Sequence, residues 1–165
     1  MDWNAIGAIG EVGGAIGVVV TLIYLASQLR QNTNALKSAS YENWNVQVAE
    51  WSHYTGQHAK ELAEAKAVKT QEELTPEQWN YLGGEFQIVL SQGECTFLKH
   101  RAGLLDDDVF EARTRALTSY FDEELNPLAR QFWADVALTG SYTQEFASFL
   151  DKQLQSSDPR TKDSG

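Results

Sequence analysis

Hydrophobic residues are concentrated in one uninterrupted segment near the start of the 165-residue chain. Residues 12–29 read VGGAIGVVVTLIYLASQL and carry no charge, and the apolar character extends back to Trp3, interrupted only by Glu11. A helix rises about 1.5 Å per residue, so a helix from Trp3 to Tyr24 approaches the roughly 30 Å of a bilayer hydrocarbon core. Trp3 and Tyr24 would then lie at the two interfaces, which favour aromatic rings. The pattern predicts a transmembrane helix within residues 1–29.

Three alternatives compete with this prediction. A buried core helix has the same composition, whereas an amphipathic surface helix would have a polar face that this segment lacks. A cleaved signal peptide would begin with a basic region, but this chain begins Met-Asp-Trp, and the small residues 38–40 lie well beyond the apolar segment. The span could also begin at Val12 and end at Leu29, since that helix is about 27 Å long and just sufficient.

The flanking charges predict an orientation for the span. Asp2 is the only charged residue before the apolar segment, whereas Arg30 and Lys37 follow it. Because Lys and Arg are enriched in cytoplasmic flanks, the N-terminus is expected outside and the C-terminal part in the cytoplasm.

After residue 29 the pattern changes to helical periodicity, and no strand pattern is found. The first helix is expected to continue past the membrane, with Trp44, Val48 and Trp51 at helical spacing on one face and a stop at Thr55-Gly56. A short helix over 57–68 and a polar loop over 69–74 follow.

Local capping signals set the remaining helices. Thr75, Pro76 and Gln78 form a strong helix start for residues 76–101, which end at Ala102-Gly103. Three further helices are expected, which begin after Asp106 or Asp107, at Asn126-Pro127 and after Thr143. The helix that begins at Asn126-Pro127 ends at Gly140. The glycines within residues 76–101 indicate close crossing by another helix. The core candidates are Trp79, Leu82, Phe86, Val89, Leu90, Phe97, Leu98, Val109, Phe110, Ala112, Leu117, Tyr120, Phe121, Leu128, Phe132, Trp133, Val136, Phe146, Phe149, Leu150 and Leu154.

The predicted fold is therefore all-α: an N-terminal transmembrane helix that continues into a cytoplasmic helical bundle. Residues 1–29 form the span, residues 30–155 the bundle, and residues 156–165 a polar disordered tail.

Composition narrows the partners. The chain has 23 acidic and 13 basic residues and a net charge of −10, which argues against a nucleic acid partner and against a polybasic lipid-binding surface. A single cysteine, Cys95, excludes an internal disulfide framework and a cysteine-based zinc site, and a free thiol suits a reducing compartment.

One face of the predicted span is a stripe of glycines, which consists of Gly7, Gly10, Gly13, Gly14 and Gly17. Glycine lowers helix stability, and in membranes such stripes allow the close backbone approach of two helices. With one span per chain, the partner is another chain, and self-association is the simplest interpretation. The alternative is that glycine is merely frequent in membrane helices.

Glu11 lies at the border of this stripe, beside Gly7 and Gly14 on the helical wheel. A carboxylate within hydrocarbon is costly and usually faces a partner or water. In a homo-oligomer Glu11 would recur as a ring, which could favour cations in a pore. If the membrane begins near Val12, Glu11 lies among the headgroups and needs no special role.

No constellation of residues predicts catalysis, a metal site or a cofactor. His53 and His58, like Cys95 and His100, are five residues apart, which keeps each pair off a common helical face. Cys95 is expected to be a small core residue. The acidic run at residues 106–108 lacks the spacing of a calcium loop and fits helix capping. Glu85 and Glu94 share a helix, where a paired-carboxylate site remains an alternative.

The opening Trp3 to Glu11 (W-x-A-I-G-x-I-x-E) and the exit Gln28 to Thr33 (Q-L-R-Q-N-T) resemble a group of short bacterial proteins. Residues 22–26, 103–106 and 146–151 look similar too, and the resemblance is most specific in the first 35 residues. It implies a single span in the bacterial inner membrane and a cytoplasmic helical domain, but it carries no activity, cofactor or partner.

The sequence thus predicts a membrane-anchored interaction or scaffold module and not an enzyme. Its expected partners are the lipid bilayer, a second copy of itself and a cytoplasmic protein. The alternative is a small homo-oligomeric ion channel whose pore is lined by Glu11.

Overall fold

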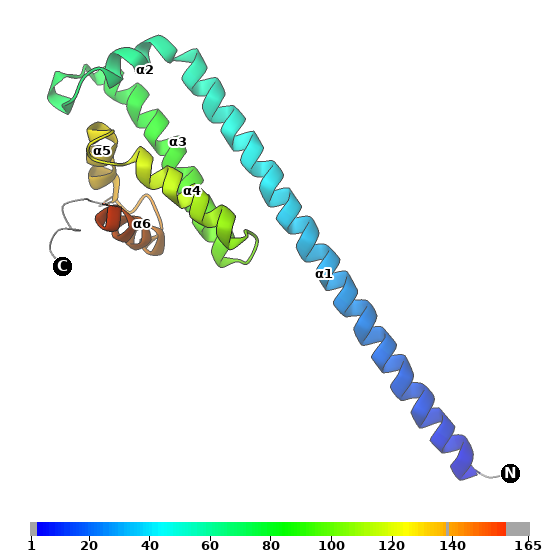
Figure 1. Ribbon diagram of the computed structural model, residues 1–165. Coiled ribbons are helices and arrows are strands. Elements are labelled where there is room, and N and C mark those ends of the chain that lie inside the picture. The colour runs from blue at the N-terminus through cyan, green and yellow to red at the C-terminus, as the bar shows by residue number, and fades with distance from the viewer. Residues whose placement is uncertain (1–2, 138, 158–165) are drawn as a thin grey trace. The chain divides into compact units, whose positions relative to one another are not determined.

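The computed structural model describes residues 3–137 and 139–157, and the side-chain surroundings of residues 10–137 and 139–156. Over these residues the chain forms α-helices and one short 3-10 helix and contains no strand (Figure 1). The elements are α1 (Trp3–Gln57), α2 (Ala59–Lys66), η1 (Gln71–Glu73), α3 (Pro76–Arg101), α4 (Asp107–Tyr120), α5 (Pro127–Ala137) and α6 (Gln144–Ser157). The predicted all-α fold class is confirmed.

The chain divides into two compact units, Met1–Tyr41 and Glu42–Gly165, and α1 contributes to both. The first unit is the apolar part of α1. This is the one helix of the described residues that is long and apolar enough to cross a membrane, and none of its most apolar 18-residue window is buried. Large apolar side chains such as Val18, Leu22 and Ile23 are about 60% exposed. The long N-terminal apolar helix that the sequence predicts is therefore present.

The second unit is a helical bundle centred on α3, which contacts both α2 and α4. Thr75 and Gln78 form the expected capping box: the Thr75 hydroxyl accepts from the Gln78 amide at 3.2 Å, and the Gln78 side chain accepts from the Thr75 amide at 3.0 Å. At the other end, Gly103 adopts a left-handed φ of 70°, which glycine accepts without strain, and the chain leaves the helix there.

The other predicted boundaries hold to within a few residues, and the stretch predicted as a loop over 69–74 contains the short 3-10 helix η1. Asp106 occupies the N-cap position of α4, and the Asn126 side chain accepts from the Ala129 amide at the start of α5. The first helix ends at Gln57, one residue after the predicted stop at Thr55-Gly56, and the His58 amide still donates to the Tyr54 carbonyl at 3.1 Å.

The core is made of apolar side chains from α2 to α6. Most of the predicted inward positions are buried or pack against buried residues, but Leu98 and Ala112 are exposed, and those two predictions were wrong. Phe97, one position earlier on α3, takes the inward place against Phe146 and Phe149. The core residues are Leu62, Ala65, Leu82, Phe86, Leu90, Leu117, Phe121, Leu128, Ala129, Trp133, Phe146, Leu150 and Leu154.

The glycines of α3 mark close contacts, as predicted. A Cβ at Gly84 would lie 2.5 Å from the Tyr54 hydroxyl, and a Cβ at Gly93 would lie 2.7 Å from Leu117 Cδ2. A side chain at either site would therefore force Tyr54 or Leu117 to move.

The predicted tail falls mostly outside the described residues. Residues 156 and 157 belong to α6, whereas residues 158–165 are not described.

Candidate functional site

The predicted glycine stripe lies within α1, and four of its members are described with their surroundings. A Cβ placed at Gly10, Gly13, Gly14 or Gly17 would meet no atom of the described residues within 4 Å. Gly7 also lies in α1, but its surroundings fall outside the described part. Packing within the described chain therefore gives no reason for glycine at these four positions, in contrast to Gly84 and Gly93.

Glu11 lies on α1 between Gly10 and the next pair of glycines and is exposed. Polar side chains farther along the apolar part of α1 bond within the helix: the Thr21 hydroxyl donates to the Gly17 carbonyl at 2.8 Å, and the Gln28 amide donates to the Tyr24 hydroxyl at 2.6 Å. Such bonds reduce the cost of polar atoms in an apolar medium.

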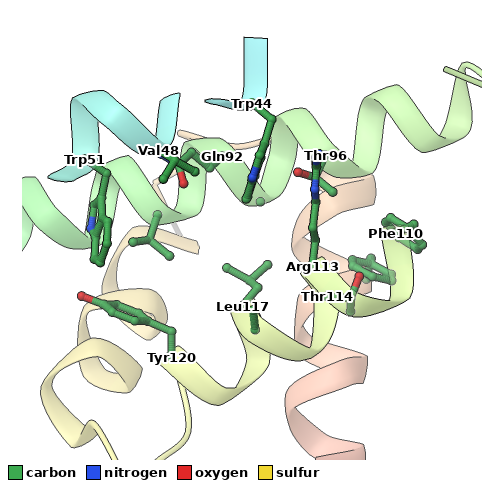
Figure 2. Close-up of a pocket in the computed structure, with 14 residues that line it drawn as sticks. Trp44, Val48, Trp51, Gln92, Thr96, Phe110, Arg113, Thr114, Leu117 and Tyr120 are labelled. Atoms are coloured by element: carbon green, nitrogen blue, oxygen red, sulfur yellow. The ribbon is translucent and has the colours of Figure 1, made fainter. Parts of the chain in front are cut away.

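A cavity of about 220 Å³ lies in the second unit between the last part of α1, α3 and α4. Figure 2 shows Trp44, Val48 and Trp51 pointing from α1 toward Leu117 and Tyr120 of α4. These three α1 residues have the helical spacing from which the sequence predicted a return to the core. They are instead only partly buried or exposed, because they line this cavity.

The wall of the cavity is mostly apolar and rich in aromatic rings. Its residues are Trp44, Val48, Trp51, Val89, Gln92, Gly93, Thr96, Phe110, Arg113, Thr114, Ala116, Leu117, Tyr120 and Phe149. The Arg113 guanidinium lies 3.9 Å from the centre of the Trp44 ring, which is a cation–π contact. The Gln92 amide donates to the Gln47 carbonyl at 3.0 Å and ties α3 to α1.

Two polar atoms of the wall have no hydrogen-bond partner among the described residues, the indole Nε1–H of Trp51 and the hydroxyl of Tyr120. Both atoms are buried. Buried donors of this kind are normally bonded, and one left without an acceptor costs free energy.

An ion pair between a buried glutamate and a partly exposed lysine adjoins the cavity at Tyr120. Glu85 of α3 has no exposed surface, and Lys66 Nζ of α2 lies 2.8 Å from its Oε1 and 2.7 Å from its Oε2. Burial and the nearby charge of Glu85 raise the pKa of Tyr120 far above its ordinary value. Burial, followed by the charges of Glu85 and Tyr81, also raises the pKa of Tyr54.

The two carboxylates considered as a pair have separate partners. Glu94 accepts a hydrogen bond from the Thr143 amide at 2.6 Å and so fixes the segment that leads into α6. Glu85 binds Lys66. Nine residues of helix place the two on opposite sides of α3 and roughly 13 Å apart along its axis, so they form no joint site.

The other residues considered for chemistry have structural contacts. His100 stacks on Phe110, with ring centres 3.9 Å apart, and its Nε2 lies 2.9 Å from Asp107 Oδ1, which joins α3 to α4. Cys95 is half-buried and not a full core residue as expected, and Gln47 Nε2 lies 3.9 Å from its sulfur. No group of three or more His, Cys, Asp or Glu side chains suitable for a metal occurs within the described part of the chain.

Sequence reasoning missed the cavity and the pairing of the buried Glu85 with Lys66. The spacing of Trp44, Val48 and Trp51 showed one wall, but the opposite wall comes from α4, about 70 residues later in the chain. For Glu85 a signal was present, because it follows Leu82 by three residues on the inward face of α3.

Comparison of the chain with protein-family models, with curated proteins and with solved structures finds no match. The assignment of a site therefore depends on the geometry described above.

Proposed function

We propose that the chain is a membrane-anchored, self-associating helical-bundle protein that serves as an interaction or scaffold module. The apolar part of α1 is the anchor, and the bundle of α2 to α6 is the part offered to a cytoplasmic protein partner. The resemblance to short bacterial proteins favours the bacterial inner membrane, and Arg30 and Lys37 favour a cytoplasmic bundle.

The observation that carries this proposal is the empty surroundings of the glycine stripe. Four glycines within eight residues lower the stability of the helix. No contact with another described residue at these positions compensates for that loss. In a membrane, small residues at this spacing let two helix backbones approach closely and gain van der Waals contact. A second copy of α1 supplies a partner with the same stripe.

The test measures the mass of the full-length protein in mild detergent by sedimentation. Gly14→Leu and Gly17→Leu should each shift the protein toward the monomer, because a bulky side chain separates the two backbones. Ile16→Leu, on the opposite face, is the matched control and should leave the oligomer intact. A monomeric wild type, or equal effects from both faces, would contradict the proposal.

The second candidate function is a small homo-oligomeric cation channel. Its support is the position of Glu11 at the edge of the stripe, since self-association would bring the carboxylates of several chains near one axis. We rank it second because it needs a water-filled centre in addition to the association.

A further inference from the structure

The cavity between α1, α3 and α4 combines three properties that together specify a ligand. Its volume of about 220 Å³ exceeds the roughly 150 Å³ of an apolar cavity that holds benzene, so one ring with a small substituent fits. Aromatic rings from three helices line it, including Trp44, Phe110 and Phe149. These flat surfaces favour a flat apolar guest.

The third property is the free donor of Trp51. Its buried Nε1–H requires a hydrogen-bond acceptor, and no described residue of the chain supplies one. Figure 2 shows the indole of Trp51 facing Tyr120 across the cavity. A guest that brings one acceptor to this position would satisfy the donor and retain the apolar contacts elsewhere.

The charges around the cavity disfavour an ionised guest. Glu85, which adjoins Tyr120, is already paired with Lys66, so an anionic guest would gain little from the charges here and would still lose its hydration. The Arg113 guanidinium over Trp44 opposes a cation on the other side. An uncharged guest avoids both costs and the larger cost of leaving water as an ion.

We infer that this cavity binds a small uncharged aromatic molecule with one hydrogen-bond acceptor, which accepts from the Nε1–H of Trp51. This activity goes beyond the proposed membrane anchoring and self-association, and it requires neither of them. It adds a small-molecule site to the bundle.

The test uses the full chain in lipid nanodiscs and two probes of the same shape. 4-Fluoroacetophenone carries a carbonyl acceptor, and 4-fluoro-α-methylstyrene has a methylene group in its place. Fluorine NMR titration, with empty nanodiscs as the background, gives a Kd for each. The ketone should bind saturably and about 2- to 13-fold more tightly than the alkene, which is the range of one neutral hydrogen bond. 4-Fluorobenzoate should bind more weakly than the ketone.

Two variants assign the site. Trp51→Phe keeps a ring but removes the N–H, so the affinity for the ketone should fall to that for the alkene. Trp79→Phe, a tryptophan outside the cavity, is the matched control and should leave the ratio unchanged. Ala116 lines the cavity but is exposed, so a larger side chain there should not disturb folding. Ala116→Phe places a ring at the cavity wall and should abolish binding of both probes.

Four results would overturn the inference: no saturable ketone binding above empty nanodiscs, equal Kd values for ketone and alkene in the wild type, tighter binding of benzoate, or unchanged binding in Ala116→Phe. Because Ala116 is exposed, that variant remains informative if Trp51→Phe fails to fold. None of these results bears on the oligomeric state, so failure here and failure of the proposed function remain distinguishable.

Discussion

Lys66 Nζ lies within 2.8 Å of both carboxylate oxygens of Glu85, and this contact fastens α2 to α3. The carboxylate has no access to solvent, whereas the lysine side chain is 43% exposed. The ammonium therefore covers a buried charge from the outside. Lys66 and Glu85 are 19 residues apart in the chain and belong to different helices. Loss of the pair should therefore weaken the packing of α2 against α3.

Lys66→Met should destabilise the protein strongly, because it leaves Glu85 buried without its counter-charge. Breaking a fully buried pair costs about 3–5 kcal/mol, and a smaller loss is expected here since water screens part of the Lys66 charge. Urea unfolding followed by circular dichroism measures the loss. The double variant Lys66→Met with Glu85→Leu should recover much of it. A single variant as stable as the wild type would show that the pair contributes nothing.

The glycines of α3 should respond oppositely to a glycine of α1. Gly93→Ala directs a methyl group at Leu117, and Gly84→Ala directs one at the Tyr54 hydroxyl, which donates to the Tyr81 carbonyl at 3.0 Å. Overpacking of this kind costs about 1–3 kcal/mol. Gly56→Ala is the control: its Cβ meets nothing described, so alanine should stabilise the helix by up to about 1 kcal/mol. In thermal unfolding, Gly93→Ala and Gly84→Ala should therefore lower the melting temperature relative to the wild type, whereas Gly56→Ala should raise it.

The stability of the bundle should fall at alkaline pH, partly through Tyr120. The raised pKa means that Tyr120 keeps its proton in the folded state while the unfolded chain loses it near pH 10. The folded state then binds more protons, so stability is complete below pH 10 and declines above it by about 1.4 kcal/mol per pH unit for each such group. Tyr120→Phe should reduce the slope above pH 10 by about one proton and leave the slope below pH 9 unchanged. Denaturant midpoints at pH 8 to 11 test this.

The orientation of α1 should depend on Arg30 and Lys37. A reporter active only in the cytoplasm, fused after Leu154, should be active in the wild type. Replacing both bases by glutamate should reduce that activity, because the N-terminal flank offers no lysine or arginine to compete. Replacing Lys60 and Lys69 by glutamate makes the same change in charge far from the span and should have little effect. Activity of a periplasmic reporter in the wild-type fusion would reverse the assignment.

Helix starts and ends were largely predictable because their signals are local. Thr75 and Gln78 lie three residues apart and satisfy each other's amides, so no distant residue is needed to form that cap. The stop predicted at Thr55-Gly56 is local in the same way, and α1 ends at Gln57, one residue later.

The cavity could not be predicted because it depends on which faces of distant helices meet. Periodicity placed Trp44, Val48 and Trp51 on one face, but only tertiary packing brings Tyr120 opposite Trp51. The same limit applies to Leu98. Its neighbour Phe97 is rotated by 100° on α3, and contact with α6 decides which of the two turns inward.

The last prediction concerns Glu11 and separates the two candidate functions. If Glu11 lines a pore, Glu11→Gln should keep the oligomer and lower its preference for cations, because the ring loses charge but keeps its shape. Glu11→Leu should then block ion flux. If Glu11 lies among the headgroups, neither change should alter permeability, and leucine should be tolerated. If Glu11 instead bonds to a neighbouring chain, Glu11→Leu should weaken the oligomer with no flux in the wild type. Liposome flux and oligomer mass, measured together on the three proteins, distinguish these outcomes. Absence of flux from fully assembled wild-type protein under voltage would eliminate the channel, because the pore hypothesis requires conduction whereas an anchored scaffold requires only association.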